Sequence, residues 1–151
     1  MNTDKIHCVQ MKRPNALGYF KSLKPSIWDI SNLIATCKYA RTPEMVEYFK
    51  SKNPSARDVS DLITSSKYAQ NQEMIEYYKS LNPSFWDISK LIANCEYAQT
   101  LEMLDYFKSL YPSYEDVDCL LANCKYARIP EMRKYRKRLM NERFFLPNKN
   151  N

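Results

Sequence analysis

The chain has 151 residues, of which 44% are hydrophobic and 13% aromatic, and it carries a formal net charge of +6 at pH 7. This composition is enough for a hydrophobic core and excludes a disordered chain. It holds no run of 18 apolar residues and no early apolar segment typical of a secretion signal, so we expect an intracellular protein, in the cytoplasm or nucleus, without a membrane partner. The single glycine disfavours β-hairpins, nucleotide-binding loops and nucleophile elbows, which indicates an all-α fold.

A 29-residue repeat runs along the chain and predicts an αα-hairpin repeat solenoid of about five units. The tyrosines at 39, 68, 97 and 126 are in register, and Cys8, Pro14 and Tyr19 precede Cys37, Pro43 and Tyr48 by the same interval. We therefore expect a single α-solenoid domain over 1–151. Its parts are a worn N-terminal repeat at 1–24, repeats at 25–53, 54–82 and 83–111, a last repeat with a C-terminal cap at 112–146, and a tail at 147–151.

Each repeat predicts a first helix that begins at a serine after a proline. An aspartate follows three residues later, as in Ser26 and Asp29, and this arrangement is a capping box with Asp in place of Glu. The same pair recurs at Ser55 and Asp58, Ser84 and Asp87, and Ser113 and Asp116. Apolar residues at helical spacing, such as Ile30, Leu33 and Ile34, predict one buried face.

The second helix of each repeat is predicted to begin after Thr42, Asn71 or Thr100 and to end before the next proline. It is expected to bury Met45, Tyr48, Phe49 and their equivalents. In the last repeat Arg133 and Arg136 replace core residues, as a terminal cap requires. Phe144, Phe145 and Leu146 are expected to fold back over the remaining apolar edge.

The cysteines and the single histidine argue against a metal centre and an enzyme. Five cysteines are an odd number and indicate reduced thiols; Cys8, Cys37, Cys95 and Cys124 share one repeat position with Ser66, which indicates a small buried packing site. His7 is the only histidine, and the carboxylates are explained as helix caps and first-turn residues. We expect no metal, no cofactor and no catalytic residues.

The residues that vary between repeats predict the functional surface. On the first helices, positions that project away from the apolar stripe carry aromatic and charged residues typical of protein interfaces. The predicted partner-binding residues are Trp28, Asn32, Arg57, Asp61, Phe85, Trp86, Lys90, Tyr114 and Glu115. The main hypothesis is a scaffold for a protein partner; under the alternative interpretation, Trp28 and Trp86 wedge adjacent hairpins together.

Two other functions remain as hypotheses. The repeated tyrosines, with Lys38, Lys67 and Lys125 beside them, suggest single-stranded RNA binding. The basic C-terminal residues are interpreted as a cap, a targeting patch or a possible anion-binding site: Arg133, Lys134, Arg136, Lys137 and Arg138. Residues 1–132 have no net charge, which favours a protein partner over a nucleic acid. The third hypothesis is a structural subunit of a larger, self-associating assembly.

Two repeat families resemble these repeats. The segment CEYAQTLEMLDYFKSL resembles the second half of a degenerate ankyrin repeat, in which a Glu-apolar-apolar-x-Tyr run forms the outer helix. PSIWDISNLI followed by CKYARTPEMVEYF is similar to pentatricopeptide repeats, which read one RNA base per repeat. The resemblance implies a helical-repeat binding protein, and the Lys, Asn, Tyr and Ile content is typical of the repeat families of large DNA viruses and intracellular bacteria.

Overall fold

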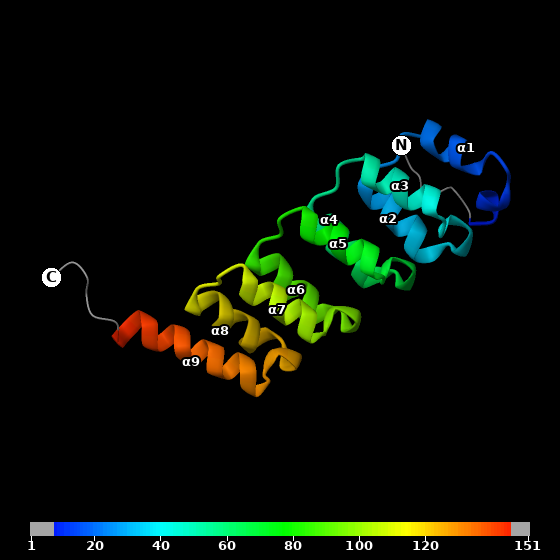
Figure 1. Cartoon of the computed structure of the whole chain (residues 1–151). Helices are drawn as coiled ribbons and strands as arrows, with labels where there is room; N and C mark the ends of the chain where they lie inside the picture. The colour runs from blue at the N-terminus through cyan, green and yellow to red at the C-terminus, as the bar shows by residue number, and fades with distance from the viewer. Residues whose placement is uncertain (1–7, 146–151) are drawn as a thin grey trace. The chain divides into compact units, whose positions relative to one another are not determined.

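The computed structural model describes residues 8–145, and their side chains as far as residue 143. All regular secondary structure in this range is helical, which confirms the predicted all-α class (Figure 1). The chain divides into two compact units, Met1–Asn82 and Pro83–Asn151, which we call the N-terminal and C-terminal units. The division falls on the predicted boundary between the repeats 54–82 and 83–111.

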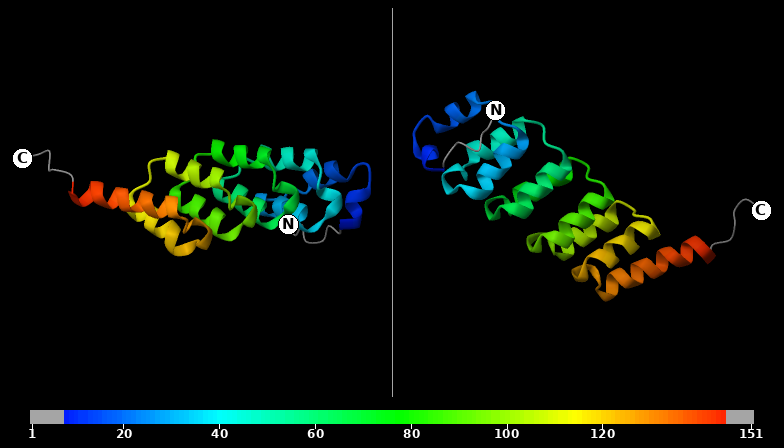
Figure 2. Two further views of the ribbon diagram at one scale, coloured as in Figure 1. Left: turned by 60° about the horizontal axis from the view of Figure 1, so that its bottom comes forward. Right: turned by 180° about the vertical axis from the view of Figure 1, so that it is seen from behind.

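The N-terminal unit consists of short helices joined as antiparallel hairpins (Figure 2). Its elements are η2 (Cys8–Lys12), α1 (Ala16–Ser22), α2 (Ile27–Thr36), η3 (Lys38–Ala40), α3 (Pro43–Ser51), α4 (Ala56–Ser65), η4 (Lys67–Ala69) and α5 (Gln72–Ser80). Helix α2 pairs with α3, α4 pairs with α5, and the two first helices α2 and α4 pack against each other.

The C-terminal unit repeats this arrangement. Its elements are α6 (Phe85–Asn94), η5 (Glu96–Ala98), α7 (Leu101–Ser109), α8 (Tyr114–Asn123), η6 (Lys125–Ala127) and α9 (Pro130–Phe145). Helix α6 packs against α7 and α8, and α8 packs against α9. None of the helices within 8–145 has the length and apolar character that a membrane span needs.

Each first helix begins at the predicted capping box. In α2 the Ser26 hydroxyl accepts a hydrogen bond from the Asp29 amide at 3.1 Å, and the Ser26 amide donates to the Asp29 carboxylate at 2.9 Å. The same reciprocal pair begins α4, α6 and α8. Each serine cap is expected to stabilise its helix by about 1 kcal/mol. The second helices begin at the predicted caps Thr42, Asn71 and Thr100.

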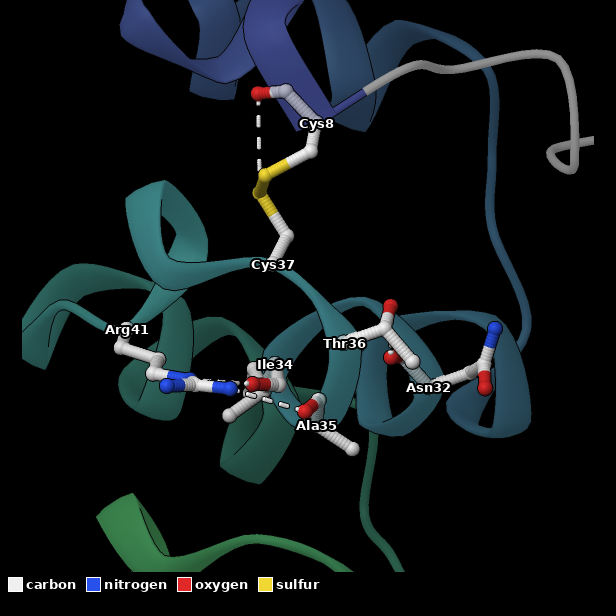
Figure 3. The surroundings of a disulfide bond; sticks show 7 residues. All are labelled: Cys8, Asn32, Ile34, Ala35, Thr36, Cys37 and Arg41. Atoms are coloured by element: carbon white, nitrogen blue, oxygen red, sulfur yellow. Dashed lines mark hydrogen bonds between the residues drawn. A yellow bond between two sulfur atoms is a disulfide. The ribbon is translucent and has the colours of Figure 1, made fainter.

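A feature that we did not predict closes each first helix. The repeated tyrosine lies in a 3-10 turn that follows the helix. In the first complete repeat this turn is Lys38–Ala40. The next side chain then reaches back to the helix: Arg41 donates from Nε to the Ile34 carbonyl at 3.1 Å and from Nη2 to the Ala35 carbonyl at 2.9 Å (Figure 3). Gln70, Gln99 and Arg128 make the equivalent bonds. These bonds satisfy carbonyl groups that a helix end leaves without partners.

Helices α1, α3, α5 and α7 are each followed by a residue with left-handed backbone, immediately before a proline. These residues are Lys24, Asn53, Asn82 and Tyr111, with φ of 50°, 55°, 53° and 56°. The prediction that proline ends the helix is therefore correct. The residue before each proline is not in the right-handed α conformation of the helix but in the left-handed one.

The core agrees with the predicted pattern except at one position. Ile30, Ile34, Met45 and Phe49 are buried, as predicted. Tyr48, which we expected to be buried, is half-buried, and so are its equivalents Tyr77, Tyr106 and Tyr135. The phenol keeps its polar end near water while a lysine from the preceding repeat covers the ring: Lys21 Nζ lies 5.1 Å from the Tyr48 centroid, with equivalent pairs Lys50 with Tyr77 and Lys108 with Tyr135.

The prediction that all cysteines are reduced is wrong for Cys8 and Cys37. They form a disulfide between η2 and the end of α2, with Cα atoms 5.2 Å apart (Figure 3). The bond joins equivalent positions of two neighbouring repeats. Cys95 and Cys124, at the same repeat position, are buried as predicted and are not in disulfides.

The last helix, α9, extends to Phe145 and is longer than the second helices before it. Arg133 is exposed where the preceding repeat has buried Leu104, and Arg136 is half-buried where it has fully buried Phe107. The predicted packing of the Phe144, Phe145 and Leu146 side chains lies outside the part of the chain that the structure describes.

Candidate protein-binding surface

The predicted surface residues of the N-terminal unit are all exposed. Trp28 and Asn32 lie one turn apart on α2, and Arg57 and Asp61 occupy the equivalent positions on α4. Because α2 and α4 are neighbours with equivalent geometry, the structure brings these four side chains to one side of this unit. Trp28 is 66% exposed, so its indole is not wedged between hairpins.

The C-terminal unit presents the equivalent surface on α6 and α8. Trp86 is 58% exposed, and Lys90, one turn later, places Nζ 5.6 Å from the centroid of the indole. Glu115 is exposed on α8. We call the exposed first-helix residues of each unit its first-helix surface: Trp28, Asn32, Arg57 and Asp61 in the N-terminal unit, and Trp86, Lys90 and Glu115 in the C-terminal unit.

A pocket of about 240 Å³ opens beside Trp86. Its lining is Trp86, Ser89, Lys90, Ala93 and Asn94 of α6 and Asn123 of α8. The lining combines one aromatic face with amide and ammonium donors. It therefore suits a protein side chain that has an apolar body and an acceptor group at its end.

Two of the predicted residues have a packing role. Phe85 is half-buried and meets Phe107 edge to face, with ring centroids 5.5 Å apart. Tyr114 is also half-buried, and the Arg143 guanidinium lies 5.9 Å from its ring centroid. We therefore leave Phe85 and Tyr114 out of the first-helix surface.

Glu115 is held at the N-terminus of α8 as a carboxylate. A hydrogen bond from its own backbone amide lowers the pKa of this carboxyl group, and the ion pair with Arg143 lowers it further. The Glu115 carboxyl group therefore stays ionised at neutral pH, and the guanidinium of Arg143 balances its charge.

One of the tyrosines proposed for RNA stacking, Tyr39, is partly covered by two lysines. Lys12 and Lys38 lie over the ring of Tyr39, with Nζ 4.7 Å and 5.2 Å from its centroid. The hydrogen bond from Lys12 also lowers the pKa of the Tyr39 phenol. A base that stacked on the Tyr39 ring would have to displace a lysine, whereas Tyr68 and Tyr97 are exposed.

The predicted basic residues lie along α9 and differ in their contacts. Arg136 pairs with Asp118 at 3.1 Å, and Arg138 pairs with Glu142 at 3.8 Å. Lys134 and Lys137 are exposed. Arg133 and Arg136 also line a pocket of about 410 Å³, together with Asp118, Leu121, Ala122 and Arg128. Sequence reasoning missed Arg128 and Asp118; the Arg or Gln that recurs at this repeat position was the available signal for Arg128.

Within residues 8–143 there is no group of three or more His, Cys, Asp or Glu side chains that would hold a metal ion. Comparisons of the chain with protein-family models, with curated proteins and with solved structures give no match. The class that the fold defines is an all-α protein of repeated helical hairpins.

Proposed function

We propose that this chain is a non-enzymatic αα-hairpin solenoid with a 29-residue period and that it binds a protein partner through the first-helix surface of each unit. The observation that carries the proposal is the exposure of Trp28 and Trp86 at the same repeat position, one in each unit. Tryptophan is the residue most enriched among the side chains that dominate protein interfaces. Burial of the two exposed indoles against a partner would contribute favourable hydrophobic free energy to binding.

The surroundings of the two tryptophans support a partner with mixed polarity. Asn32 lies one turn from Trp28 on α2, Arg57 and Asp61 occupy the equivalent positions on the neighbouring α4, and Lys90 with the pocket of about 240 Å³ adjoins Trp86. Both signs of charge are present, and residues 1–132 carry no net charge. Such a surface suits the varied side chains of a protein better than the uniform phosphates of a nucleic acid.

The chain contains only two tryptophans, one on the first-helix surface of each unit, so its tryptophan fluorescence reports directly on partner binding. We would first capture partners with the tagged full chain and compare the Trp28→Ala, Trp86→Ala double variant. The matched control is a Leu101→Ala, Tyr111→Ala double variant, because these residues are 57% and 89% exposed but lie outside the first-helix surface.

The expected result is a protein that is retained by the wild type and by the control but lost with the tryptophan double variant. Adding that purified protein to the wild type should then shift tryptophan emission to shorter wavelength. Partners retained equally by all three chains would contradict the proposal. Loss of a self-associated form with the tryptophan variant would favour the structural-subunit alternative. Tight binding of labelled single-stranded RNA at physiological salt would favour the RNA alternative.

A further inference from the structure

The larger of the two pockets described above differs in chemistry from the pocket beside Trp86, because three arginines line it. We propose that the pocket between α8 and α9 is a binding site for a phosphate monoester, held by Arg128, Arg133 and Arg136. Its volume is about 410 Å³, and its remaining lining is Asp118, Leu121 and Ala122. The proposal does not depend on the partner bound by the tryptophans.

The pocket has an excess of positive charge, which favours binding of a dianion. Three guanidinium groups face one carboxylate, that of Asp118. A phosphate monoester carries between one and two negative charges at neutral pH and offers three acceptor oxygens. Guanidinium groups match this geometry because each presents several donors in a fixed plane.

The three arginines are positioned in different ways. Arg128 is fixed by its bonds to the α8 carbonyls, from Nε to Leu121 at 2.7 Å and from Nη2 to Ala122 at 3.0 Å, and its Nη1 donors are not used in these bonds. Arg136 uses Nη1 to bind Asp118 at 3.1 Å. The Arg133 guanidinium makes no ion pair or hydrogen bond with any other residue in the described part of the chain.

The earlier repeats show how unusual these residues are at their positions. Asp118 replaces Ser89, which is 4% exposed, and Arg133 and Arg136 replace Leu104 and Phe107, which are buried. A terminal cap needs a polar surface, but either sign of charge or an uncharged polar residue would supply it. Here the substitutions instead collect positive charge around a concavity.

The shape of the pocket restricts the ligand. A phosphate group fills only part of the volume, so the rest of the ligand would pack on Leu121 and Ala122. A polynucleotide would require a row of cations along the chain, whereas the excess positive charge is confined to the end of the sequence. The ligand class is therefore a single phosphorylated group, borne either by a small molecule or by a side chain of another protein.

The test is titration of the full chain with phenyl phosphate and with a phosphoserine peptide, monitored by calorimetry and by NMR of the arginine Nε–H groups. Phenol and the unphosphorylated peptide are the ligand controls. We expect Arg133→Gln to weaken binding of the phosphorylated probes about tenfold or more. The matched control is Lys137→Gln, which removes the same charge from an exposed position on α9 outside the pocket and should change affinity less than about twofold.

A second variant tests the role of the carboxylate. Asp118→Asn removes the group that competes for Arg136 and should strengthen phosphate binding by several-fold. If Arg133→Gln and Lys137→Gln weaken phosphate binding equally, net charge alone attracts the ligand and the proposal is overturned. Weaker phosphate binding by Asp118→Asn, or no binding by the wild type, would also overturn it. Tighter binding of the phosphopeptide than of phenyl phosphate would identify a protein-borne ligand, and the reverse order a small molecule; both orders support the site.

Discussion

Replacing Tyr111 by asparagine should stabilise the C-terminal unit. Tyr111 has φ of 56°, in the left-handed region, where an ordinary side chain costs about 1 to 2 kcal/mol and asparagine is better tolerated. The tyrosine is 89% exposed, so its removal loses little burial. The chain itself supplies the comparison, since Asn53 and Asn82 occupy the equivalent positions with φ of 55° and 53°. We expect Tyr111→Asn to stabilise the fold by about 0.5 to 1 kcal/mol.

Urea unfolding followed by circular dichroism measures this change, and a gain of that size raises Tm by about 1 to 4 °C in a chain of this length. The reverse substitution, Asn53→Tyr, serves as the matched control and should destabilise by a similar amount. If Tyr111→Asn lowers stability, or if both variants shift the midpoint in the same direction, the backbone explanation is refuted. Side-chain contacts would then decide the preference at this position.

Three further outcomes follow from other contacts. Ser66→Ala should stabilise the fold by about 1 kcal/mol in urea unfolding, because the buried Ser66 hydroxyl has no hydrogen-bond partner within the described residues; a loss of stability would indicate an additional partner. Gln99→Ala should lower the free energy of unfolding by about 1 kcal/mol, because it removes the 3.0 Å hydrogen bond to the Ile92 carbonyl. Gln99→Arg should be tolerated, because arginine makes the equivalent bond in the first and last complete repeats. An equal loss of stability in both variants would contradict a capping role. Because the folded pKa of Glu115 is lowered, its stabilising contribution is present above its unfolded pKa and is lost as pH falls through the folded pKa. NMR titration of the carboxyl carbon should show that pKa rising when Arg143 is replaced by Gln, and an unchanged pKa would contradict a contribution from the ion pair.

The helix boundaries were largely predictable because residues within a few positions of each boundary determine them. A serine after proline with an aspartate three residues on specifies a helix start within four residues, and all four such starts are present. The exposed positions of Trp28 and Trp86 were predictable for the same reason, since helical period alone sets which side chains face outward.

The features that were missed depend on how the chain folds back on itself. The cap at the end of each first helix comes from a side chain seven residues beyond the accepting carbonyl, as with Arg41 and Ile34, and no short motif marks that separation. The phosphate pocket required knowing that α9 places Arg133 and Arg136 beside Arg128 and Asp118. The half-burial of Tyr48 follows from a lysine of the neighbouring repeat, which helical period within one repeat does not show.

The disulfide between Cys8 and Cys37 makes the leading segment of the chain sensitive to its redox surroundings. It closes a loop across a separation of 29 residues, and a cross-link of that span restricts the unfolded chain by about 3 to 4 kcal/mol. While the bond is intact, η2 and α1 cannot fray away from α2, and proteases meet fewer open conformations there. Reduction removes this tether from the N-terminal unit alone, because the equivalent Cys95 and Cys124 of the C-terminal unit are not joined.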